Sequence, residues 1–431
     1  MNPIEPQADL NRRSFLKGSS FATLMMMLGG VEITAQEADK KTAAPKVEKK
    51  IGAPVKCGVI GVGTWGRDLI GHLSRLPNAP ITAVSETYGA SLRRAKSGAP
   101  NATPYEDYRQ LLESKDVEAV IVATPTHQHK EIVLAALQAG KHVYCEAPLA
   151  HTIEDAKAIA QAAKNASKQI FQVGLQYRAN PQHHHVLEFV RTGAAGALTL
   201  ARAQYHKKES WRRTSPSPER EKELNWRLRQ DTSPGLVGEI GIHSIDVASW
   251  FLRANPVSVT GFGSIMHWKD GRNVADTAQT IVEYPNGARI IYDATLTNSY
   301  EGNYDVFSGT DAAVLIRENR AWMFKEADSP LLGWEVYAKK DTFPATGEAG
   351  IALVANATQL IAQGLKPAEA AADGDSAAYY SLEAFIESIN EKKAPEAGWK
   401  EGFAATVTAL KANEAVNKNT KIALDAKLFE V

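Results

Sequence analysis

Cysteine is scarce in this chain of 431 residues, which has only Cys57 and Cys145. Both lie in apolar runs, so we interpret them as small buried side chains and not as a disulfide or metal ligands. The chain also lacks an excess of charge, because 49 Lys and Arg residues balance 49 Asp and Glu residues. This balance argues against nucleic acid or an anionic membrane as a partner. We interpret a local basic pair such as Arg212 and Arg213 as part of a solvated loop.

The N-terminal segment lacks an apolar run of the roughly 20 residues that span a bilayer. Arg12 and Arg13 precede Ser-Phe-Leu-Lys and a short apolar run, residues 21–28. Positive charges, a short apolar segment and Ala35 as a small-residue exit predict an export signal. The paired arginines resemble the twin-arginine signal. We therefore expect residues 1–35 to be a signal peptide read by the twin-arginine translocase, and a periplasmic or otherwise exported protein without a membrane span after cleavage.

A linker and then an α/β domain follow the expected signal peptide. Residues 36–53 are rich in Lys, Glu and Ala without apolar periodicity, which is typical of a linker. Residues 54–175 alternate short apolar strands with helices, which predicts an α/β domain with a doubly wound parallel sheet of the Rossmann type. The expected strands are Val55–Ile60, Ile81–Ser85, Val117–Ala123, Lys141–Cys145 and Gln169–Gly174, and the expected helices are Gly66–Leu76, Glu131–Ala139 and Ile153–Asn165.

Residues 176–400 have a different rhythm, in which strands follow one another with few helices between them. This pattern predicts an α+β domain with a large, mostly antiparallel open sheet. The expected strands are Leu198–Tyr205, Val257–Met266, Thr277–Tyr284, Ala288–Leu296 and Ala313–Arg317, with helices at Ile242–Arg253, Ile351–Ile361 and Tyr379–Asn390. Residues 401–431 should form a C-terminal helix, Gly402–Val416, and a tail that packs back on the fold.

A glycine-rich turn follows the first strand directly and opens the first helix. It reads Gly61-Val62-Gly63-Thr64-Trp65-Gly66. In this context the first glycine permits a tight turn, the second lets a pyrophosphate approach the backbone, and the third allows close packing of helix and strand. The phosphates would lie at the helix N-terminus, where free N–H groups favour anions. The turn therefore predicts a dinucleotide site.

The residue after the second strand bears on which dinucleotide binds. Glu86 lies 20 residues after Gly66, where a carboxylate accepts hydrogen bonds from the adenosine ribose and repels a 2′-phosphate. NAD is therefore the expected cofactor. Arg93 and Arg94 follow shortly and could recruit a 2′-phosphate, so NADP stays possible.

Four further motifs follow in a fixed order along the chain. They are residues 123–129 (Ala-Thr-Pro-Thr-His-Gln-His), 139–149 (Ala-Gly-Lys-His-Val-Tyr-Cys-Glu-Ala-Pro-Leu), 176–181 (Gln-Tyr-Arg-Ala-Asn-Pro) and 238–246 (Gly-Glu-Ile-Gly-Ile-His-Ser-Ile-Asp). With the glycine turn, they resemble the glucose–fructose oxidoreductase/inositol dehydrogenase/MocA (Gfo/Idh/MocA) family of NAD(P)-dependent enzymes over residues 55–425. The resemblance implies a nicotinamide-binding domain, a substrate domain with an open sheet, and a homo-oligomer.

The resemblance also assigns roles to individual residues. It implies His243 as the base that takes a hydroxyl proton and Glu239, four residues earlier on the same helical face, as its partner or a substrate ligand. Tyr177 could supply a hydroxyl near the reacting centre or pack between domains. The expected cofactor contacts beyond the glycine turn and Glu86 are Thr124, Pro125, His129, Glu146, Pro148 and Arg178.

One position departs from the family pattern. The family's Glu-Lys-Pro is Glu146-Ala147-Pro148 here, and a methyl group cannot donate a hydrogen bond to the reacting oxygen. Another group must do this work, or the reaction differs. Lys207 is a candidate, in a region where Tyr205 and Trp226 could also line the substrate pocket. No metal is expected, because the consecutive His183-His184-His185 point in different directions on a helix.

Three functions remain open from the sequence. The first is an exported oxidoreductase that acts on a secondary hydroxyl of a sugar, glycoside or polyol with a tightly held cofactor. The second is an NAD-dependent glycoside hydrolase that uses transient oxidation and elimination, which Ala147 keeps open. The third is a non-catalytic sugar-binding protein on the same fold, against which the intact glycines and His243 argue.

Overall fold

The computed structural model describes residues 51–332, 335, 340–342, 347–355 and 374–431. The expected signal peptide and almost all of the expected linker lie outside the described residues. Contacts divide the chain into two units, of which one contains Lys49–His184, Leu198–Ser308 and Asp375–Val431, and the other contains His185–Ala197 and Gly309–Gly374. All candidate site residues from the sequence belong to the first of these units.

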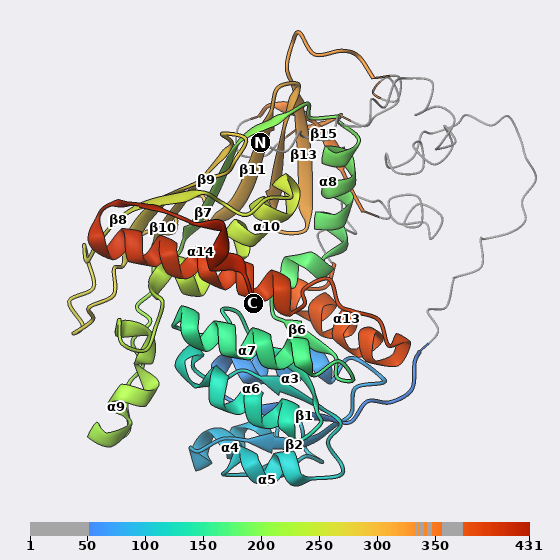
Figure 1. Cartoon of the computed structure of the whole chain (residues 1–431), viewed down its shortest axis with the longest axis vertical. Coiled ribbons are helices and arrows are strands. Elements are labelled where there is room, and N and C mark those ends of the chain that lie inside the picture. Colours follow the sequence, from blue (N-terminus) through green and yellow to red (C-terminus); the bar gives the residue numbers. More distant parts are fainter. Residues whose placement is uncertain (1–50, 333–334, 336–339, 343–346, 356–373) are drawn as a thin grey trace, which may run out of the picture. The chain divides into compact units, whose positions relative to one another are not determined.

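A six-stranded parallel sheet confirms the predicted Rossmann architecture (Figure 1). Its order is β3 (Thr103–Tyr105), β2 (Ile81–Ser85), β1 (Cys57–Ile60), β4 (Ala119–Val122), β5 (His142–Cys145) and β6 (Phe171–Val173). Every side chain of β1, β4 and β6 is buried, as expected for strands with helices on both faces. The flanking helices are α3 (Thr64–Leu73), α4 (Gly89–Ala95), α5 (Tyr108–Glu113), α6 (His129–Gln138) and α7 (Ile153–Asn165).

A second sheet confirms the predicted antiparallel domain. In the larger unit its strands run in the order β11 (Asn303–Gly309), β7 (Leu198–His206), β10 (Arg289–Thr295), β9 (Thr277–Glu283), β8 (Ser258–Ser264) and β16 (Lys421–Ala423). Strands β7 and β10 pair in parallel, while β8, β9, β10 and β16 pair antiparallel. The smaller unit has the order β14 (Lys340–Thr342), β15 (Ala349–Leu353), β13 (Arg320–Lys325) and β12 (Ala312–Arg317).

One expected helix is wrong where the structure describes it. Residues 349–353 form strand β15, which pairs with β13 and β14, so the start of the predicted helix Ile351–Ile361 is extended. The apolar residues Ile351 and Leu353 are buried and Ala352 between them is less so, which is the alternation of a strand. A segment of five residues is too short for this period to be distinguished from a helical one in the sequence. The rest of that predicted helix lies outside the described residues.

Helix α14 (Trp399–Lys418) connects the two sheets of the larger unit. It packs against α7 and β6 of the Rossmann layer and against β8 and β9 of the second sheet, and Figure 1 shows it lying along the β8 end of that sheet. Small residues permit the close approach, because a Cβ on Gly402 would lie 2.3 Å from Val173 and one on Gly261 would lie 2.7 Å from Val416. The position of one sheet relative to the other therefore depends on this helix.

The remaining helices are shorter than α14. They are α8 (Pro181–Arg191), α9 (Pro218–Leu224), α10 (Ile242–Leu252) and α13 (Ala377–Glu391). Among the described residues, no helix combines the length and apolar character that a membrane span requires.

The turn between β1 and α3 places two glycines in close contact. Gly61 has a φ of 88°, in the left-handed region that favours glycine. A Cβ on Gly66 would lie only 1.9 Å from the Gly61 carbonyl oxygen, whereas a Cβ on Gly71, later in the same helix, would meet no atom within 4 Å. The two helical glycines therefore have opposite steric environments.

We predict opposite effects when each helical glycine is replaced by alanine. Gly66→Ala must displace the backbone of the turn, which should lower the free energy of unfolding by about 1–3 kcal/mol. Gly71→Ala should raise it by about 0.5–1 kcal/mol, because alanine is the better helix former. Urea denaturation of both variants measures the difference, and equal effects would contradict this account of the turn.

Candidate active site

The glycine turn leaves open space at the N-terminus of α3. Gly63 is the N-cap residue, no side chain caps the helix, and its first turn contains no acidic residue. A Cβ added to Gly63 would meet nothing within 4 Å. The first N–H groups of the helix, which include those of Thr64 and Trp65, therefore face a space without competing protein acceptors. Such a helix terminus fits the pyrophosphate of a dinucleotide.

Glu86 follows β2 and lies next to this turn in the sheet order. The side chain is half-buried, and its Oε1 accepts hydrogen bonds from the backbone N–H of Tyr88 at 3.0 Å and the hydroxyl of Thr87 at 3.2 Å. These contacts orient the carboxylate and leave Oε2 without a hydrogen bond among the described residues. The arrangement fits a ribose that donates its hydroxyls to Glu86. Arg93 and Arg94, which could bind the 2′-phosphate of NADP instead, are exposed on α4.

The loop after β4 is held by a buried histidine. His129 Nδ1 lies 3.0 Å from the carbonyl oxygen of Pro148, and Nε2 lies 3.0 Å from that of Thr124. Burial lowers the pKa of His129 to about 4, so the ring is neutral and donates to one of these carbonyls. Both ring nitrogens face the protein backbone, so His129 can serve the cofactor site only by holding the loops that contain Thr124 and Pro148. Pro125 begins the short helical turn between them, Thr126–Gln128.

The loop after β5 contains an unusual carboxyl group. Burial raises the pKa of Glu146 to about 7, while Trp65 in the first turn of α3 and Arg227 oppose the rise. Its Oε1 is buried and has no hydrogen-bond partner within the part of the chain that the structure describes, and the same is true of the Thr124 hydroxyl. Ala147, at the position of the family lysine, is only half-buried, and the Ala147–Pro148 bond is cis. The loops after β4 and β5 therefore contain polar atoms without partners, and the neighbouring side chain of Ala147 has no polar atom that could pair with them.

A buried ion pair connects the Rossmann sheet to helix α10. Arg178, which follows β6, donates from Nε and Nη2 to both carboxylate oxygens of Asp246 at 2.8 and 2.9 Å. Their side chains are 11% and 4% exposed, so this bidentate pair is shielded from water. The pair occupies two nitrogens of Arg178, which was predicted to contact the cofactor.

Two rings that the sequence had singled out belong to residues near this ion pair in the chain. Tyr177 precedes Arg178, and its ring is 6.0 Å from that of His243 in an edge-to-face arrangement. Tyr177 also stacks on His183 at 4.5 Å. The structure therefore brings the two predicted catalytic side chains together, although they lie 66 positions apart in the sequence.

Both rings are uncharged near neutral pH. Burial lowers the pKa of His243 to about 4, and its Nδ1 has no hydrogen-bond partner among the described residues. Burial, followed by the nearby Asp305, raises the pKa of Tyr177 to about 12. A neutral imidazole can accept a proton and a neutral phenol can donate a hydrogen bond, so together they can hold an alcohol oxygen.

Glu239 lies in a turn of π-helix, Val237–Gly241, directly before α10. Its Oε1 accepts hydrogen bonds from the hydroxyls of Thr126 at 3.1 Å and Ser233 at 3.2 Å. No hydrogen bond to His243 is present, so Glu239 touches the loop after β4 and not the predicted base. Burial raises the pKa of Glu239, and Arg227 and the two hydroxyls oppose this effect. Turns of π-helix occur frequently at functional sites.

The predicted substrate residues lie on β7 and on the long segment after it. Tyr205 donates its hydroxyl to Glu209 at 3.2 Å, and Lys207 forms an ion pair with the same carboxylate at 2.8 Å. The Lys207 side chain is 56% exposed. The indole of Trp226 lies 6.2 Å from the ring of His127, in the loop after β4. Of these three residues, Trp226 therefore lies against the loop after β4, which also contains Thr124.

Arg227 belongs to the site, although no sequence motif contains it. Its guanidinium lies between Trp211 and Trp226, 5.6 and 5.1 Å from their ring centres, and its Nε is 3.4 Å from Oε2 of Glu239. Thr126, Ser233 and Asp246 were also not predicted as site residues. Asp246 ends the motif at 238–246, but its partner is visible only in the folded chain.

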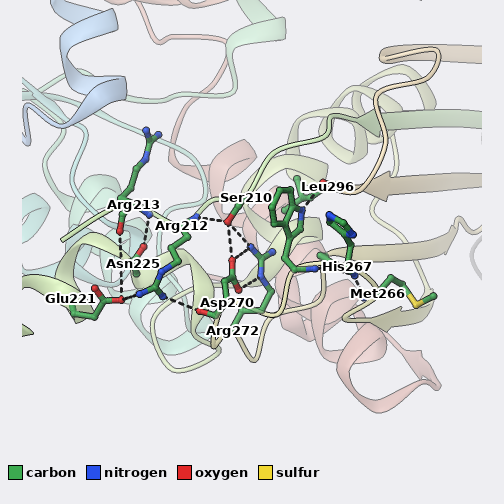
Figure 2. Close-up of polar contacts among 12 residues, drawn as sticks. Ser210, Arg212, Arg213, Glu221, Asn225, Met266, His267, Asp270, Arg272 and Leu296 are labelled. Atoms are coloured by element: carbon green, nitrogen blue, oxygen red, sulfur yellow. Dashed lines mark hydrogen bonds and ion pairs between the residues drawn. The ribbon is translucent and has the colours of Figure 1, made fainter.

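A network of polar contacts shapes the segment that contains Trp211 and Arg227. Arg212 contacts Glu221 at 2.5 Å and the backbone oxygen of Asp270 at 2.9 Å, and Asn225 bonds to the backbone of Arg213 from both its side-chain atoms (Figure 2). Arg272 donates hydrogen bonds from two nitrogens to the Asp270 carboxylate. The predicted solvated loop around Arg212 and Arg213 is therefore tied down by ion pairs and hydrogen bonds.

The described residues show no cluster of three or more histidine, cysteine, aspartate or glutamate side chains that could hold a metal ion. His183 stacks on Tyr177, while His184 lies against Trp250 and contacts Glu396 at 3.2 Å. The three consecutive histidines thus have different surroundings, as their positions on a helix predict.

Comparison with known proteins identifies the same two parts of the chain. Residues 55–175 match the model of an oxidoreductase family with an NAD-binding Rossmann fold, GFO/IDH/MocA, and residues 183–314 match the GFO/IDH/MocA C-terminal domain. The chain is 28% identical over 268 residues to levoglucosan dehydrogenase of Pseudarthrobacter phenanthrenivorans, which covers 57% of this chain and 66% of that protein. It is 32% identical over 230 residues to inositol 2-dehydrogenase of Rubrobacter xylanophilus, which covers 52% and 59%. The matches thus span slightly less than two thirds of these relatives.

Solved structures show the same fold over more of the chain. A levoglucosan dehydrogenase in complex with NADH and L-sorbose superposes with a TM-score of 0.70 at 21% identity, covering 86% of this chain and 99% of that one. A myo-inositol 2-dehydrogenase from Lactobacillus plantarum superposes with a TM-score of 0.65 at 18% identity, covering 86% and 100%. At these identities the likeness establishes the architecture of both sheets.

Proposed function

Because this chain belongs to the GFO/IDH/MocA oxidoreductase family, we propose that it is an NAD-dependent oxidoreductase that acts on a secondary hydroxyl of a sugar, glycoside or polyol. The observation that carries the proposal is the set of buried polar atoms that have no hydrogen-bond partner among the described residues: the Thr124 hydroxyl and Glu146 Oε1 on the loops after β4 and β5, and His243 Nδ1 on α10. Buried polar atoms normally have partners, so their presence together is consistent with a polar ligand that supplies them.

The dinucleotide would lie with its pyrophosphate on the N–H groups of α3 and its ribose on Glu86. NAD is the better match, because Glu86 is held toward that position by Tyr88 and Thr87. A nicotinamide bound in this way would supply the acceptor for a hydride from the substrate carbon. We propose that the cofactor is held tightly and recycles in place, since an exported enzyme has no loose supply of it.

The protein's own residues would handle the proton. His243 Nδ1, free of a protein partner, accepts the proton of the substrate hydroxyl as the C–H electron pair leaves the carbon. The Tyr177 hydroxyl, neutral because its pKa is about 12, donates a hydrogen bond to the same oxygen. The product is a ketone. Glu239 does not contact His243 and instead holds the loop after β4 through Thr126.

A glycoside hydrolase is the second candidate, and Ala147 is the observation that favours it. In that reaction the hydroxyl is oxidised transiently, the neighbouring C–H becomes acidic, and the aglycone leaves by elimination before water adds and the ketone is reduced. The net result is hydrolysis without accumulation of reduced cofactor. The same cofactor site and His243 would serve both reactions.

We expect the purified protein to release NAD or NADH on denaturation, identified by mass. With added NAD, a panel of polyols and sugars should produce NADH absorbance, whereas a panel of chromogenic glycosides should report aglycone release. NADH formation without aglycone release supports the oxidoreductase, and the reverse supports the hydrolase. A protein that neither holds nor binds a nicotinamide dinucleotide would overturn both.

His243→Ala should lower kcat/KM by about 10²–10⁴-fold, because it removes the proton acceptor. In the native protein the acid limb of kcat/KM should lie near pH 4, where the neutral ring of His243 becomes protonated, and not near the ordinary ~6.5. A stopped assay across pH 3.5–8 measures both. If the fall of kcat/KM at low pH persists unchanged in His243→Ala, another group and not His243 causes that fall.

We propose export through the twin-arginine pathway, supported by the pattern around Arg12 and Arg13. The full-length chain expressed in a bacterium that has the translocase should appear in the periplasmic fraction. The double variant Arg12→Lys and Arg13→Lys should remain in the cytoplasm. An equal distribution of the two proteins on immunoblots would argue against this route.

A homo-oligomer remains our proposal from the family. It is consistent with three exposed apolar side chains on β8, β9 and β10, Phe262, Ile281 and Ile291, which alternate with buried residues in these strands. Light scattering of the purified protein decides between a monomer and a larger assembly.

A further inference from the structure

At the position where the family pattern has lysine, this chain has Ala147, so that position provides no cation. Ala147 provides a methyl group, and it follows Glu146, whose Oε1 is buried without a partner. Oxidation of an alcohol develops negative charge on oxygen as the proton leaves, and a fixed positive charge stabilises such an oxygen strongly in a site shielded from water. The reaction under "Proposed function" therefore needs a cation from elsewhere in the fold.

Two basic residues that the sequence offered are already engaged. Lys207 is paired with Glu209 and more than half exposed, and Arg178 forms two hydrogen bonds with Asp246. His243, His127 and His151 do not supply a charge either, because burial lowers the pKa of each ring. These five side chains leave the charge requirement unmet.

Arg227 meets the requirement by its position beside Glu239. Its Nε is 3.4 Å from Glu239 Oε2, within ion-pair distance, yet this nitrogen is buried without a properly aligned hydrogen bond. Arg227 also lies close enough to Glu146 and Tyr205 for its charge to act on both. The side chain is 39% exposed, so it is accessible from outside the protein although it contacts Glu239.

The surroundings of Arg227 hold the guanidinium in a single place. The indoles of Trp211 and Trp226 flank it at 5.6 and 5.1 Å, which favours the charged group by cation–π attraction. The segment that contains these three residues is tied down by Arg212, through Glu221 and the Asp270 backbone (Figure 2). A cation held in this way needs little reorganisation when charge develops on a substrate.

We propose that Arg227 contacts the reacting oxygen of the substrate and supplies the positive charge that Ala147 does not. The inference rests on the proposed function and deepens it by assigning a catalytic residue. Glu239 balances the charge of Arg227 before substrate binds, and Trp226 presents an aromatic face beside it for a sugar ring. The proton still moves to His243, so charge stabilisation and proton transfer belong to different side chains.

The test compares four variants for oxidation of the best polyol or sugar substrate and for NADH binding. Arg227→Ala should lower kcat by about 10²–10³-fold, as loss of one oxyanion-stabilising group does, while the affinity for NADH stays unchanged. Arg227→Lys should retain more activity than Arg227→Ala. Adding guanidinium should restore part of the Arg227→Ala activity, and adding Ala147→Lys to Arg227→Ala should do the same. Arg229→Met, which removes an exposed arginine paired with Asp231, is the matched control and should be unaffected.

The outcomes separate this inference from the proposed function. An active wild type with equal kcat in Arg227→Ala would overturn the role of Arg227 and leave the function standing. Loss of activity with neither guanidinium nor Ala147→Lys rescue, together with weakened NADH binding, would also overturn it, because Arg227 would then only maintain the fold. A wild type that binds no dinucleotide and oxidises no substrate would overturn both proposals.

Discussion

The bidentate pair between Arg178 and Asp246 is the contact on which the geometry of the site depends. Arg178 follows the last strand of the Rossmann sheet, and Asp246 lies on helix α10, so the pair joins the dinucleotide half to the helix that contains His243. Burial of two charges is costly, but two short hydrogen bonds offset it, and breaking such a pair typically costs about 3–5 kcal/mol. Tyr177 and His243 each lie within a turn of this pair, so their edge-to-face contact is set by it.

The electrostatics of the site follow from burial more than from charge pairs. Burial raises the pKa of Glu146 and Glu239 and lowers that of His243, so each group is pushed toward its neutral form. An environment of this kind leaves little opposing charge close to a substrate. Two arginines accompany these groups: Arg178 is paired with Asp246, and Arg227 lies against the rings of Trp211 and Trp226 within ion-pair distance of Glu239.

Much of the architecture could be predicted from sequence because its signals are local. The Gly61–Gly66 turn, the apolar runs of β1 and β4, and the cap at Thr152 that begins α7 all depend on neighbouring residues. Strand β15 was mistaken for a helix because five residues are too few to show a period. Thr126 and Ser233 were not predicted, because a hydroxyl that donates to Glu239 has no sequence signature, whether it lies 113 residues away or six.

The sequence by itself determined the family, the order of the two sheets along the chain, the dinucleotide turn and the pair Glu239 and His243, because each is encoded by residues close together in the chain. Only the tertiary structure decided what those side chains touch. It placed Glu239 on Thr126 and not on His243, engaged Arg178 with Asp246, and brought Arg227 within ion-pair distance of Glu239. Such contacts join segments far apart in the sequence, and their energies depend on distances and burial that only folding defines.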